Sequence, residues 1–586
     1  MKKKKIDQII VEVICNALQS IVEQMGVVLI RSAYSTNIKE RRDCSCAIFD
    51  SKGKLVALAE HIPIHLGSMQ GLMRKIIEDF NSWNFQPDDV IITNDPYTGG
   101  GSHLPDVTFV KPVFYNNQLV AFVSNIAHWS DIGGRAPGVG TAGDSTEILQ
   151  EGLRIPPIRI INKGKIRQDI LELILINVRN REERIGDFNA QIASLGLGDQ
   201  RLIALFRRYG ISIINKCIFE LFSYSERCFS LALKEVPEGN YNFSDLMDDD
   251  GISNEYLPIS VEIRVKHKPT SSIILDFSGT ASQARGGINI VWAALEATVL
   301  YSMKAIFVPD VPVNAGFYKI INIKAMKGSL VNAIEPAPVG GRTDTCQRVV
   351  DVIMGAMSKI IPNKIVTAST GATTALIFSG TKSLTGKDFI YVEALGGGLG
   401  ARVKKDGIDG IQVHITNTSN LPIEAMELEY PLMVLHYGLV PDSCGAGKTR
   451  GGLSIRKDFK ILKPLFFSGH SDRHKIPPWG LMEGSSGECG SFTLNPETKN
   501  EQIINSKISN LLIKKGDILR ITTAGGGGFG PAIMRDPNLV LKDYLLGKIS
   551  EKEAREGYGV ILTNYGTVDY DLTLILRTQM QRKEGE

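Results

Sequence analysis

The chain has 586 residues, of which 43% are hydrophobic and 22% charged, an ordinary composition for a folded protein of several domains. Its net charge of +3 is close to neutral for this length and gives no electrostatic case for a nucleic-acid partner. The sequence shows no signal peptide, no uninterrupted apolar run long enough to cross a bilayer, and no CxxC pair among its eight cysteines. We therefore expect a cytoplasmic protein without a membrane partner.

Hydrophobic periodicity predicts the first elements of the chain. They are a long helix over 7–33, two short strands over 46–50 and 55–58, and a helix over 66–81 that begins after His65. His61 and His65 lie four residues apart, but Pro63 between them argues against a regular helix and a shared metal. Asp43, just before the first strand, is a candidate metal ligand, with an Arg–Asp ion pair as the equal alternative.

A glycine-rich segment that begins at Asn94 is the most informative stretch of the chain. It ends in His103 and Asp106, three residues apart. Pro105 disfavours a helical conformation before it, so an irregular turn is expected there. A second His/Asp pair, His128 and Asp131, follows after a predicted β-hairpin. Imidazole nitrogens and carboxylates that converge in a loop are the ligands that a divalent metal needs.

The predicted hairpin would bring the two pairs together. Its strands are residues 107–114 and 118–127, joined by the turn Asn116-Asn117. With this two-residue turn Asp106 falls one position out of line with His128, and a three-residue loop would place them directly opposite. Opposed residues have Cβ atoms about 5 Å apart, a gap that a metal can bridge. Pro112 indicates an edge strand or a bulge. Hydrogen-bonded loop histidines are the structural alternative.

The remaining elements complete an α+β fold. We expect a large multilobed molecule with mixed and antiparallel sheets and long helices. The elements are helices within 166–236, strands over 259–266 and 272–277, a helix from 286 to 307, and a glycine-punctuated β-rich part from about 385. The predicted lobes are a metal-binding lobe 1–238, an α/β lobe 239–384 and a glycine-rich β lobe 385–586.

Two further polar segments lie beyond the hairpin. Residues 340–348 are expected to form a polar loop that opens an apolar helix at Val349. The helix start and Arg342 would suit an anionic group, and a plain capped helix start is an equal interpretation. Residues 471–474, with the sequence Ser-Asp-Arg-His, could form a second polar cluster, but an exposed salt bridge in a loop is the expected interpretation.

Taken together, several stretches resemble the hydantoinase B/5-oxoprolinase family, which also includes the metal-bearing subunit of acetone carboxylase. The matching stretches are 94–106, 127–134, 145–157, 340–351, 417–424, 438–443 and 525–530. They follow one another in order over nearly the whole chain, which makes the resemblance more specific than any single motif.

The resemblance implies the B subunit of an enzyme, an ATP-dependent hydrolase of cyclic amides such as hydantoins, 5-oxoproline or lactams. In this family an A-type ATPase subunit uses ATP to phosphorylate the substrate's carbonyl oxygen, and the B subunit processes the activated small molecule. A hetero-oligomer with such a partner is therefore expected. A subunit of an ATP-dependent ketone carboxylase and a non-catalytic scaffold for the ATPase subunit are the alternatives.

The resemblance also implies which residues act. The metal-holding positions of the carboxylase relatives correspond to His103, Asp106 and His128, with Asp43 as a fourth ligand. Zinc, manganese or iron suits such ligands, with zinc favoured for hydrolysis and manganese for carboxylation. The metal is expected to activate a water molecule and polarise the reacting carbonyl. Asp131 or His65 is the expected general base.

Overall fold

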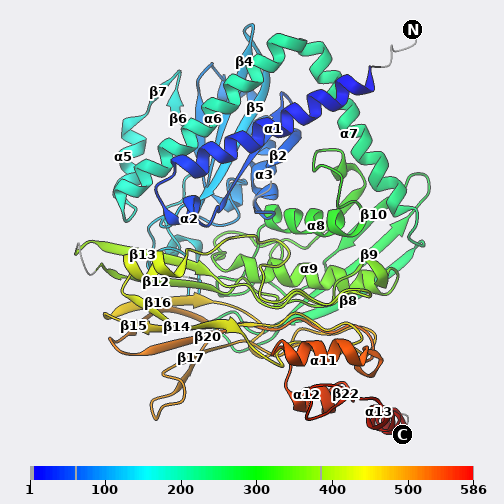
Figure 1. Ribbon diagram of the computed structural model, residues 1–586. Helices are drawn as coiled ribbons and strands as arrows, with labels where there is room; N and C mark the ends of the chain where they lie inside the picture. Colours follow the sequence, from blue (N-terminus) through cyan, green and yellow to red (C-terminus); the bar gives the residue numbers. More distant parts are fainter. Residues whose placement is uncertain (1–5, 60–61, 141, 383–385, 585–586) are drawn as a thin grey trace.

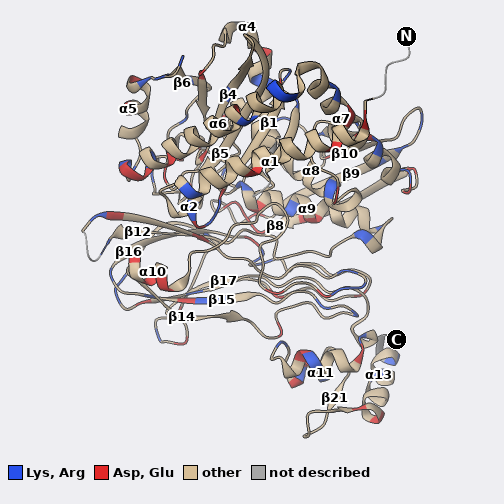
Figure 2. Ribbon diagram, turned by 45° about the horizontal axis from the view of Figure 1, so that its top comes forward, with Lys and Arg blue, Asp and Glu red and all other residues tan. Residues whose placement is uncertain are grey.

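The computed structural model describes residues 6–59, 62–140, 142–382 and 386–584, and it has an α+β fold (Figure 1). Helices and sheets alternate in the N-terminal half, and stacked sheets make up most of the C-terminal part. Basic and acidic residues both occur along all parts of the ribbon (Figure 2). The predicted fold class, with mixed and antiparallel sheets and long helices, is confirmed.

The N-terminal half is built on one antiparallel sheet of seven strands. In sheet order these are β2 (Leu55–Ala59), β1 (Cys44–Asp50), β5 (Gln118–His128), β4 (Asp106–Tyr115), β3 (Val90–Thr93), β6 (Ile158–Asn162) and β7 (Lys165–Ile166). Helices α1 (Gln8–Ser32) and α6 (Arg181–Tyr209) lie over this sheet, and α3 (His65–Glu78) packs against β1 and β5 (Figure 1). The short helix α2 (Thr36–Lys39) connects α1 to β1, and α5 (Gln168–Ile176) and α7 (Ile211–Leu233) flank α6 along the chain.

Helix α1 is long and apolar enough to cross a membrane by length and composition, which the sequence analysis did not anticipate. Its buried residues, which include Ile14, Leu18 and Val22, lie on one face. That face contacts β1, β2, α6 and α7. Packing in the core therefore accounts for the apolar residues of this face, whereas Ile9, Val13 and Val27 of the same helix are exposed.

The hairpin of β4 and β5 has the predicted two-residue turn, yet Asp106 lies directly opposite His128. The register starts with Tyr115 opposite Gln118 and shifts by one residue at a β-bulge between Val113 and Phe114. A bulge places two residues of one strand against one of the other, so it has the effect that a longer turn would have had. Pro112 is next to this bulge, as one of the two interpretations of that proline predicted.

The middle of the chain forms a mixed four-stranded sheet. Its strands, in sheet order, are β11 (Ile321–Lys324), β10 (Ser272–Asp276), β9 (Leu257–Lys266) and β8 (Gly239–Met247). Helix α9 (Arg342–Ser358) packs on β8 and β9, and α8 (Trp292–Phe307) lies between α9 and α3. The expected helix start at residue 286 is therefore wrong by six residues.

Helix α9 also begins earlier than expected, at Arg342 instead of Val349. The sequence analysis took the polar residues before Val349 as a loop. In the structure all of them are buried, and several have charged or polar partners on other elements. A polar stretch was therefore mistaken for a solvent-exposed one.

The C-terminal part contains two antiparallel sheets that share a hydrophobic core. One sheet has the order β13 (Asp388–Ala394), β12 (Ala375–Thr381), β16 (Leu465–His470), β19 (Lys507–Ile513). The other has the order β14 (Leu432–Leu439), β15 (Ile455–Ile461), β20 (Ile518–Thr522), β17 (Ser491–Leu494), β18 (Gln502–Ile504). The last helices, α11 (Pro537–Leu545), α12 (Glu551–Glu556) and α13 (Tyr570–Glu584), project from this part (Figure 1).

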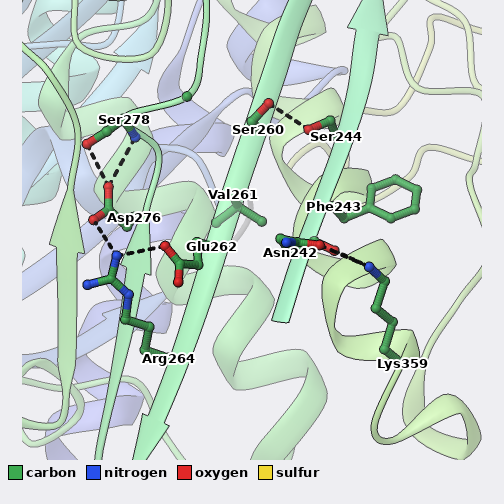
Figure 3. A pocket seen from close by; sticks show the side chains of 11 residues that line it. Asn242, Phe243, Ser244, Ser260, Val261, Glu262, Arg264, Asp276, Ser278 and Lys359 are labelled. Carbon is green, nitrogen blue, oxygen red and sulfur yellow. Dashed lines mark hydrogen bonds and ion pairs between the residues drawn. The ribbon is translucent and has the colours of Figure 1, made fainter. Parts of the chain in front are cut away.

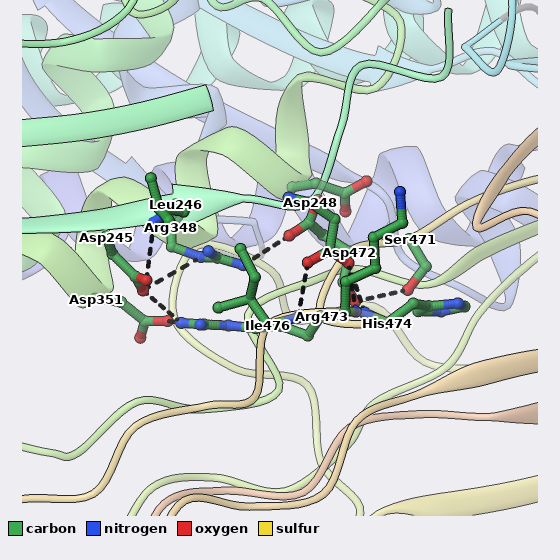
Figure 4. A network of polar contacts seen from close by, with 12 residues as sticks. Asp245, Leu246, Asp248, Arg348, Asp351, Ser471, Asp472, Arg473, His474 and Ile476 are labelled. Carbon is green, nitrogen blue, oxygen red and sulfur yellow. Dashed lines mark hydrogen bonds and ion pairs between the residues drawn. The ribbon is translucent and has the colours of Figure 1, made fainter. Parts of the chain in front are cut away.

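The loop after β16 joins the C-terminal part to α9 and β8 (Figure 4). Asp472 and Arg473 of this loop are almost fully buried, so the expectation of an exposed salt bridge is wrong. Arg473 contacts the carboxylates of Asp245 and Asp351, and Asp472 contacts Arg348.

The largest hydrophobic cluster of the described residues has members between Ile14 and Ile415 in the sequence. The division into lobes at residues 238 and 384 stays a prediction.

Candidate metal centre

The mouth of the β4–β5 hairpin gathers three potential metal ligands. Asp106 is the first residue of β4 and His128 the last of β5. His103 comes from the turn just before β4, and one ligand atom from each of the three lies within 4.8 Å of the other two. The His103 and His128 ring centroids are 4.9 Å apart. All three side chains are buried.

The glycine-rich loop before His103 is held by close backbone packing. A Cβ on Gly101 would lie 2.9 Å from the carbonyl oxygens of Asn94, His103 and Asp106, so only glycine fits without rearrangement. The Asn94 side chain donates to the Leu104 carbonyl at 2.8 Å. The close packing of the loop backbone and the hydrogen bond from the Asn94 side chain together hold His103 near Asp106.

Asp106 has one oxygen bound and one free. Its Oδ2 accepts from Ser102 Oγ at 2.8 Å and from Arg342 Nη2 at 2.7 Å. Its Oδ1 has no hydrogen-bond partner in the described part of the chain, and the same holds for both ring nitrogens of His103. His103 Nε2 lies 3.3 Å from that free oxygen. Buried acceptors left without donors are the arrangement that a cation would satisfy.

The protonation states of these groups suit a metal. Burial, and next the nearby Arg342, lower the pKa of His103 to about 4. Burial and then His103 lower the pKa of His128 well below its usual value. Burial opposes ionisation of Asp106, but His103 and Arg342 outweigh it and hold the pKa of that carboxyl well below its usual value. Near neutral pH the centre therefore offers two uncharged imidazoles and one carboxylate.

His128 is fixed by a chain of polar side chains. Asn37 Nδ2 lies 3.1 Å from His128 Nδ1, and Arg41 Nη1 donates to Asn37 Oδ1 at 2.8 Å. An ion pair between Arg41 and Asp43 does not form in this arrangement, since no contact within 4.0 Å joins them among the described residues. Arg41 instead donates to Asn37, which in turn contacts His128.

His65 and Asp43 lie beside the three ligands. His65 Nε2 is 3.5 Å from Asp43 Oδ1 and 3.6 Å from Asp106 Oδ1, and its Nδ1 is 3.2 Å from Ser45 Oγ. Burial raises the pKa of the Asp43 carboxyl. Asp43 is outside the group of three whose ligand atoms lie within 4.8 Å. His61 lies outside the described residues.

Asp131, the other expected base, is placed elsewhere. Its two oxygens accept hydrogen bonds from the backbone of Gly133, Gly138 and Arg179 and from the Arg179 guanidinium. These four bonds order the loop after β5, and the side chain is fully buried. Asp131 does not line the cavity at the metal centre.

A small cavity of about 50 Å³ opens on the metal centre. Its wall combines residues from all three predicted lobes, among them Arg41, His65, Arg342 and His470. A water needs roughly 10–15 Å³ of such space, so the cavity has room for a few waters or one small reacting group.

His470, at the end of β16, belongs to this wall and was not anticipated from the sequence. Its Nδ1 lies 2.8 Å from Asp344 Oδ2, and Asp344 Oδ1 accepts from the Thr373 backbone at 3.1 Å. Histidine and aspartate are 126 positions apart in the sequence, so no local motif could reveal the pair. The local sign in the sequence was Asp344 in the first turn of α9, which lies in the segment that was interpreted as a capped helix start.

Other hollows on the molecule offer less chemistry. A groove of about 640 Å³ lies on the outer face of β8–β10 (Figure 3). Its polar groups bond to one another: Arg264 to Glu262, Asp276 to Ser278, Ser244 to Ser260 and Lys359 to Asn242. A site in which the polar groups already have partners gives no reason to expect a reactive ligand.

Comparison with known proteins gives the family. The profile of the hydantoinase B/oxoprolinase family matches residues 7–532. The chain belongs to this family. It is 33% identical to the B subunit of a candidate D-/L-hydantoinase from Pseudomonas sp. (strain NS671), over 98% of each chain.

Two solved structures have the same fold. The crystal structure of an ATP-dependent caprolactamase from Pseudomonas jessenii superposes with a TM-score of 0.89 at 28% identity, covering 98% of this chain and all of that one. A nucleotide-free acetone carboxylase structure also gives a TM-score of 0.89, at 19% identity, over 99% of this chain and 83% of that chain. The second likeness concerns the fold alone.

Proposed function

We propose that this chain is the metal-bearing B subunit of an ATP-dependent cyclic-amide hydrolase. The observation that carries the proposal is the buried group of His103, Asp106 and His128, in which both ring nitrogens of His103 and Asp106 Oδ1 have no hydrogen-bond partner among the described residues. Membership of the hydantoinase B/oxoprolinase family and the fold shared with a caprolactamase support the substrate class. An A-type ATPase subunit is the proposed partner, and phosphorylation of the substrate's carbonyl oxygen is its proposed role.

His103, Asp106 and His128 would hold the metal, and zinc or manganese fits two imidazoles and a carboxylate. When bound, the cation would lower the pKa of a coordinated water toward about 7 and polarise the reacting carbonyl. Ser102 and Arg342 keep Asp106 ionised and fix its orientation, leaving Oδ1 for the ligand role. Asp43 is proposed to act through His65 and not as a direct ligand.

The histidine tautomer adds a requirement at His128. A ring nitrogen that binds a metal carries no proton, so binding through Nε2 puts the proton on Nδ1. That N–H then needs an acceptor, and the neighbouring amide is Asn37. We infer that the Asn37 amide turns over in the metal-loaded protein, so that its oxygen accepts from His128 Nδ1 and no longer from Arg41, as carboxylates and carbonyls accept at many metal-bound histidines.

The chain provides two groups for proton transfer. His65 lines the cavity between Asp43 and Asp106 and is the proposed general base toward water. His470, held by Asp344, lines the same cavity and is the proposed proton donor to the leaving nitrogen. Asp131 is assigned a structural role, because its four hydrogen bonds use both oxygens.

The test is reconstitution with the ATPase subunit. Lactams, hydantoins and 5-oxoproline are supplied with ATP, and ring-opened product and phosphate release are measured together. The proposal predicts product formation that needs both subunits and is lost in His103→Ala. ATP turnover that requires bicarbonate and a ketone would instead support the carboxylase alternative. Full turnover by an assembled His103→Ala complex would support the scaffold alternative.

A further inference from the structure

We propose that Arg41 forms an oxyanion-binding site in the wall of the metal-centre cavity. The ligand would be a phosphoryl or carboxylate group of the reacting molecule, so the inference deepens the proposed function and rests on it for the identity of that molecule. The site is separate from the three metal ligands and uses donors from other elements.

Arg41 is an exception among the buried arginines of the described chain. Seven arginines there are buried. Six of them have a carboxylate within 4.0 Å, namely Arg184, Arg342, Arg348, Arg450, Arg473 and Arg535. Arg41 is 5% exposed and has no such partner among the described residues. A buried cation without a counter-charge is unfavourable, so the fold retains one where an anion arrives from outside.

The guanidinium of Arg41 has donors to spare. Nη1 bonds to Asn37 Oδ1, a neutral group, at 2.8 Å. Nε is buried without a hydrogen-bond partner in the part of the chain that the structure describes. Because the side chain lines the cavity, an entering group would meet these unused N–H groups. Arginine presents its N–H groups in a fork that matches phosphate and carboxylate oxygens.

Other donors face the same space. The hydroxyls of Thr373 and Thr418 line the cavity and have no hydrogen-bond partner among the described residues. Helix α9 also begins in this wall, at Arg342, with no side chain capping its first turn. The positive end of the helix dipole and the two hydroxyls therefore face the same cavity as Arg41, which follows α2 in the chain. An acceptor group bound in the cavity would satisfy these unused donors.

The charges at the cavity also favour an anion. Arg342 is neutralised by Asp106, with 2.7 Å between Nη2 and Oδ2. Arg41 and Asp43 also line the wall, and no contact within 4.0 Å joins their charged groups among the described residues. A divalent cation at the metal centre would leave the cavity positive. The volume of about 50 Å³ suits one phosphoryl or carboxylate group.

The experiment is a calorimetric titration of the full-length chain with inorganic phosphate and, separately, with acetate. The variants are Arg41→Met and, as a matched control, Arg42→Met, which removes an adjacent arginine that is exposed. Each protein is titrated as purified and again after dialysis against a chelator, so that a change in metal content cannot be mistaken for a change at Arg41.

We expect Arg41→Met to weaken binding of at least one of the two ions by at least about tenfold, and Arg42→Met to leave it unchanged. Phosphate without acetate binding identifies the phosphoryl group as the ligand, and the reverse identifies a carboxylate. Equal affinities of wild type and Arg41→Met, or no binding of either ion to wild type, overturn the proposal. If Arg41→Met does not fold, Thr373→Val should weaken binding by about threefold or more, and unchanged affinity counts against the site. Binding and amide turnover are measured separately, so this proposal and the proposed function can fail independently.

Discussion

Two buried polar regions of this chain differ in how their charges are matched. The network around the loop after β16 contains Arg348 and Arg473, both fully buried (Figure 4). Arg348 lies 2.6 Å from Asp472, and Arg473 lies 2.7 Å from Asp351 and 2.9 Å from Asp245. The network ties α9, β8 and the C-terminal sheets together, and each of its arginines has a carboxylate partner.

The metal centre differs from this network. Some N–H groups of Arg348 and Arg473 are also buried without a hydrogen-bond partner among the described residues, but each of those guanidinium groups has a carboxylate beside it. His103 and Asp106 Oδ1 have no hydrogen-bond partner among the described residues, and Arg41 has no carboxylate. Buried groups with partners contribute to the fold, whereas buried groups without partners cost stability until a ligand binds. The comparison therefore assigns stability to the network and chemistry to the metal centre.

Asp472→Ala should reduce the free energy of unfolding by about 3–5 kcal/mol, because it leaves Arg348 and Lys507 buried without that partner. Denaturant unfolding of the full-length chain measures the loss. The folded fraction should keep the wild-type metal content. As a control, Glu497→Ala removes a carboxylate from an exposed pair with Arg520 and should leave the unfolding midpoint nearly unchanged. Loss of metal without loss of stability in Asp472→Ala would contradict the division.

His470→Gln should lower kcat by about 10²–10⁴-fold in the reconstituted complex, because the amide nitrogen loses its proton donor. Metal content and thermal stability should change little, since Asp344 keeps its bond to the Thr373 backbone. Steady-state kinetics of the reconstituted complex measures the effect. An unchanged kcat would remove His470 from the mechanism.

Asn37→Leu should weaken metal binding by about 10–100-fold, because His128 loses the neighbour that fixes its tautomer. Asn37→Asp is the matched comparison and should retain tight binding, since a carboxylate accepts from Nδ1–H. Competition with a chromophoric chelator gives both affinities. Equal affinities in the two variants would mean that Asn37 does not orient the ligand.

Per pH unit, Glu151 should give the smallest effect, a change in how the free energy of unfolding depends on pH. Its side chain accepts from the backbone of Val339 and Gly340, and burial raises the pKa of the carboxyl to about 7. The folded state thus holds this proton more tightly than the unfolded state does, so protonated Glu151 stabilises the fold fully at pH values below the ordinary glutamate pKa. This stabilisation is lost as pH rises to about 7, by about 1.4 kcal/mol per pH unit for this one group.

Glu151→Gln should remove this part of the pH dependence. Urea unfolding between pH 5 and 8 measures it, and the variant should gain stability relative to wild type as pH rises. An identical slope in both proteins would show that Glu151 does not hold a proton in the folded state.

Local sequence was sufficient to predict the hairpin and the meeting of His103, Asp106 and His128 at its mouth, because strand alternation and a short turn determine which ends meet. Pro112 indicated either an edge strand or a bulge, and the sequence alone did not decide between them, since the outcome depends on packing against neighbouring strands. It is the bulge that aligns Asp106 with His128. Polar character misled the analysis at α9 and at residues 471–474, where buried charges have partners that are distant in the sequence. His470 was missed for the same reason.

The central claim is that His103, Asp106 and His128 hold one divalent cation. The most direct measurement is the metal content of the purified full-length chain by mass spectrometry, compared with His103→Ala and with the control His436→Ala, an exposed histidine on β14. The account predicts about one metal ion per chain in wild type and in the control, and less than about a tenth of that in His103→Ala. Full metal content in His103→Ala, or an active complex in which the wild-type chain carries no metal, would contradict it.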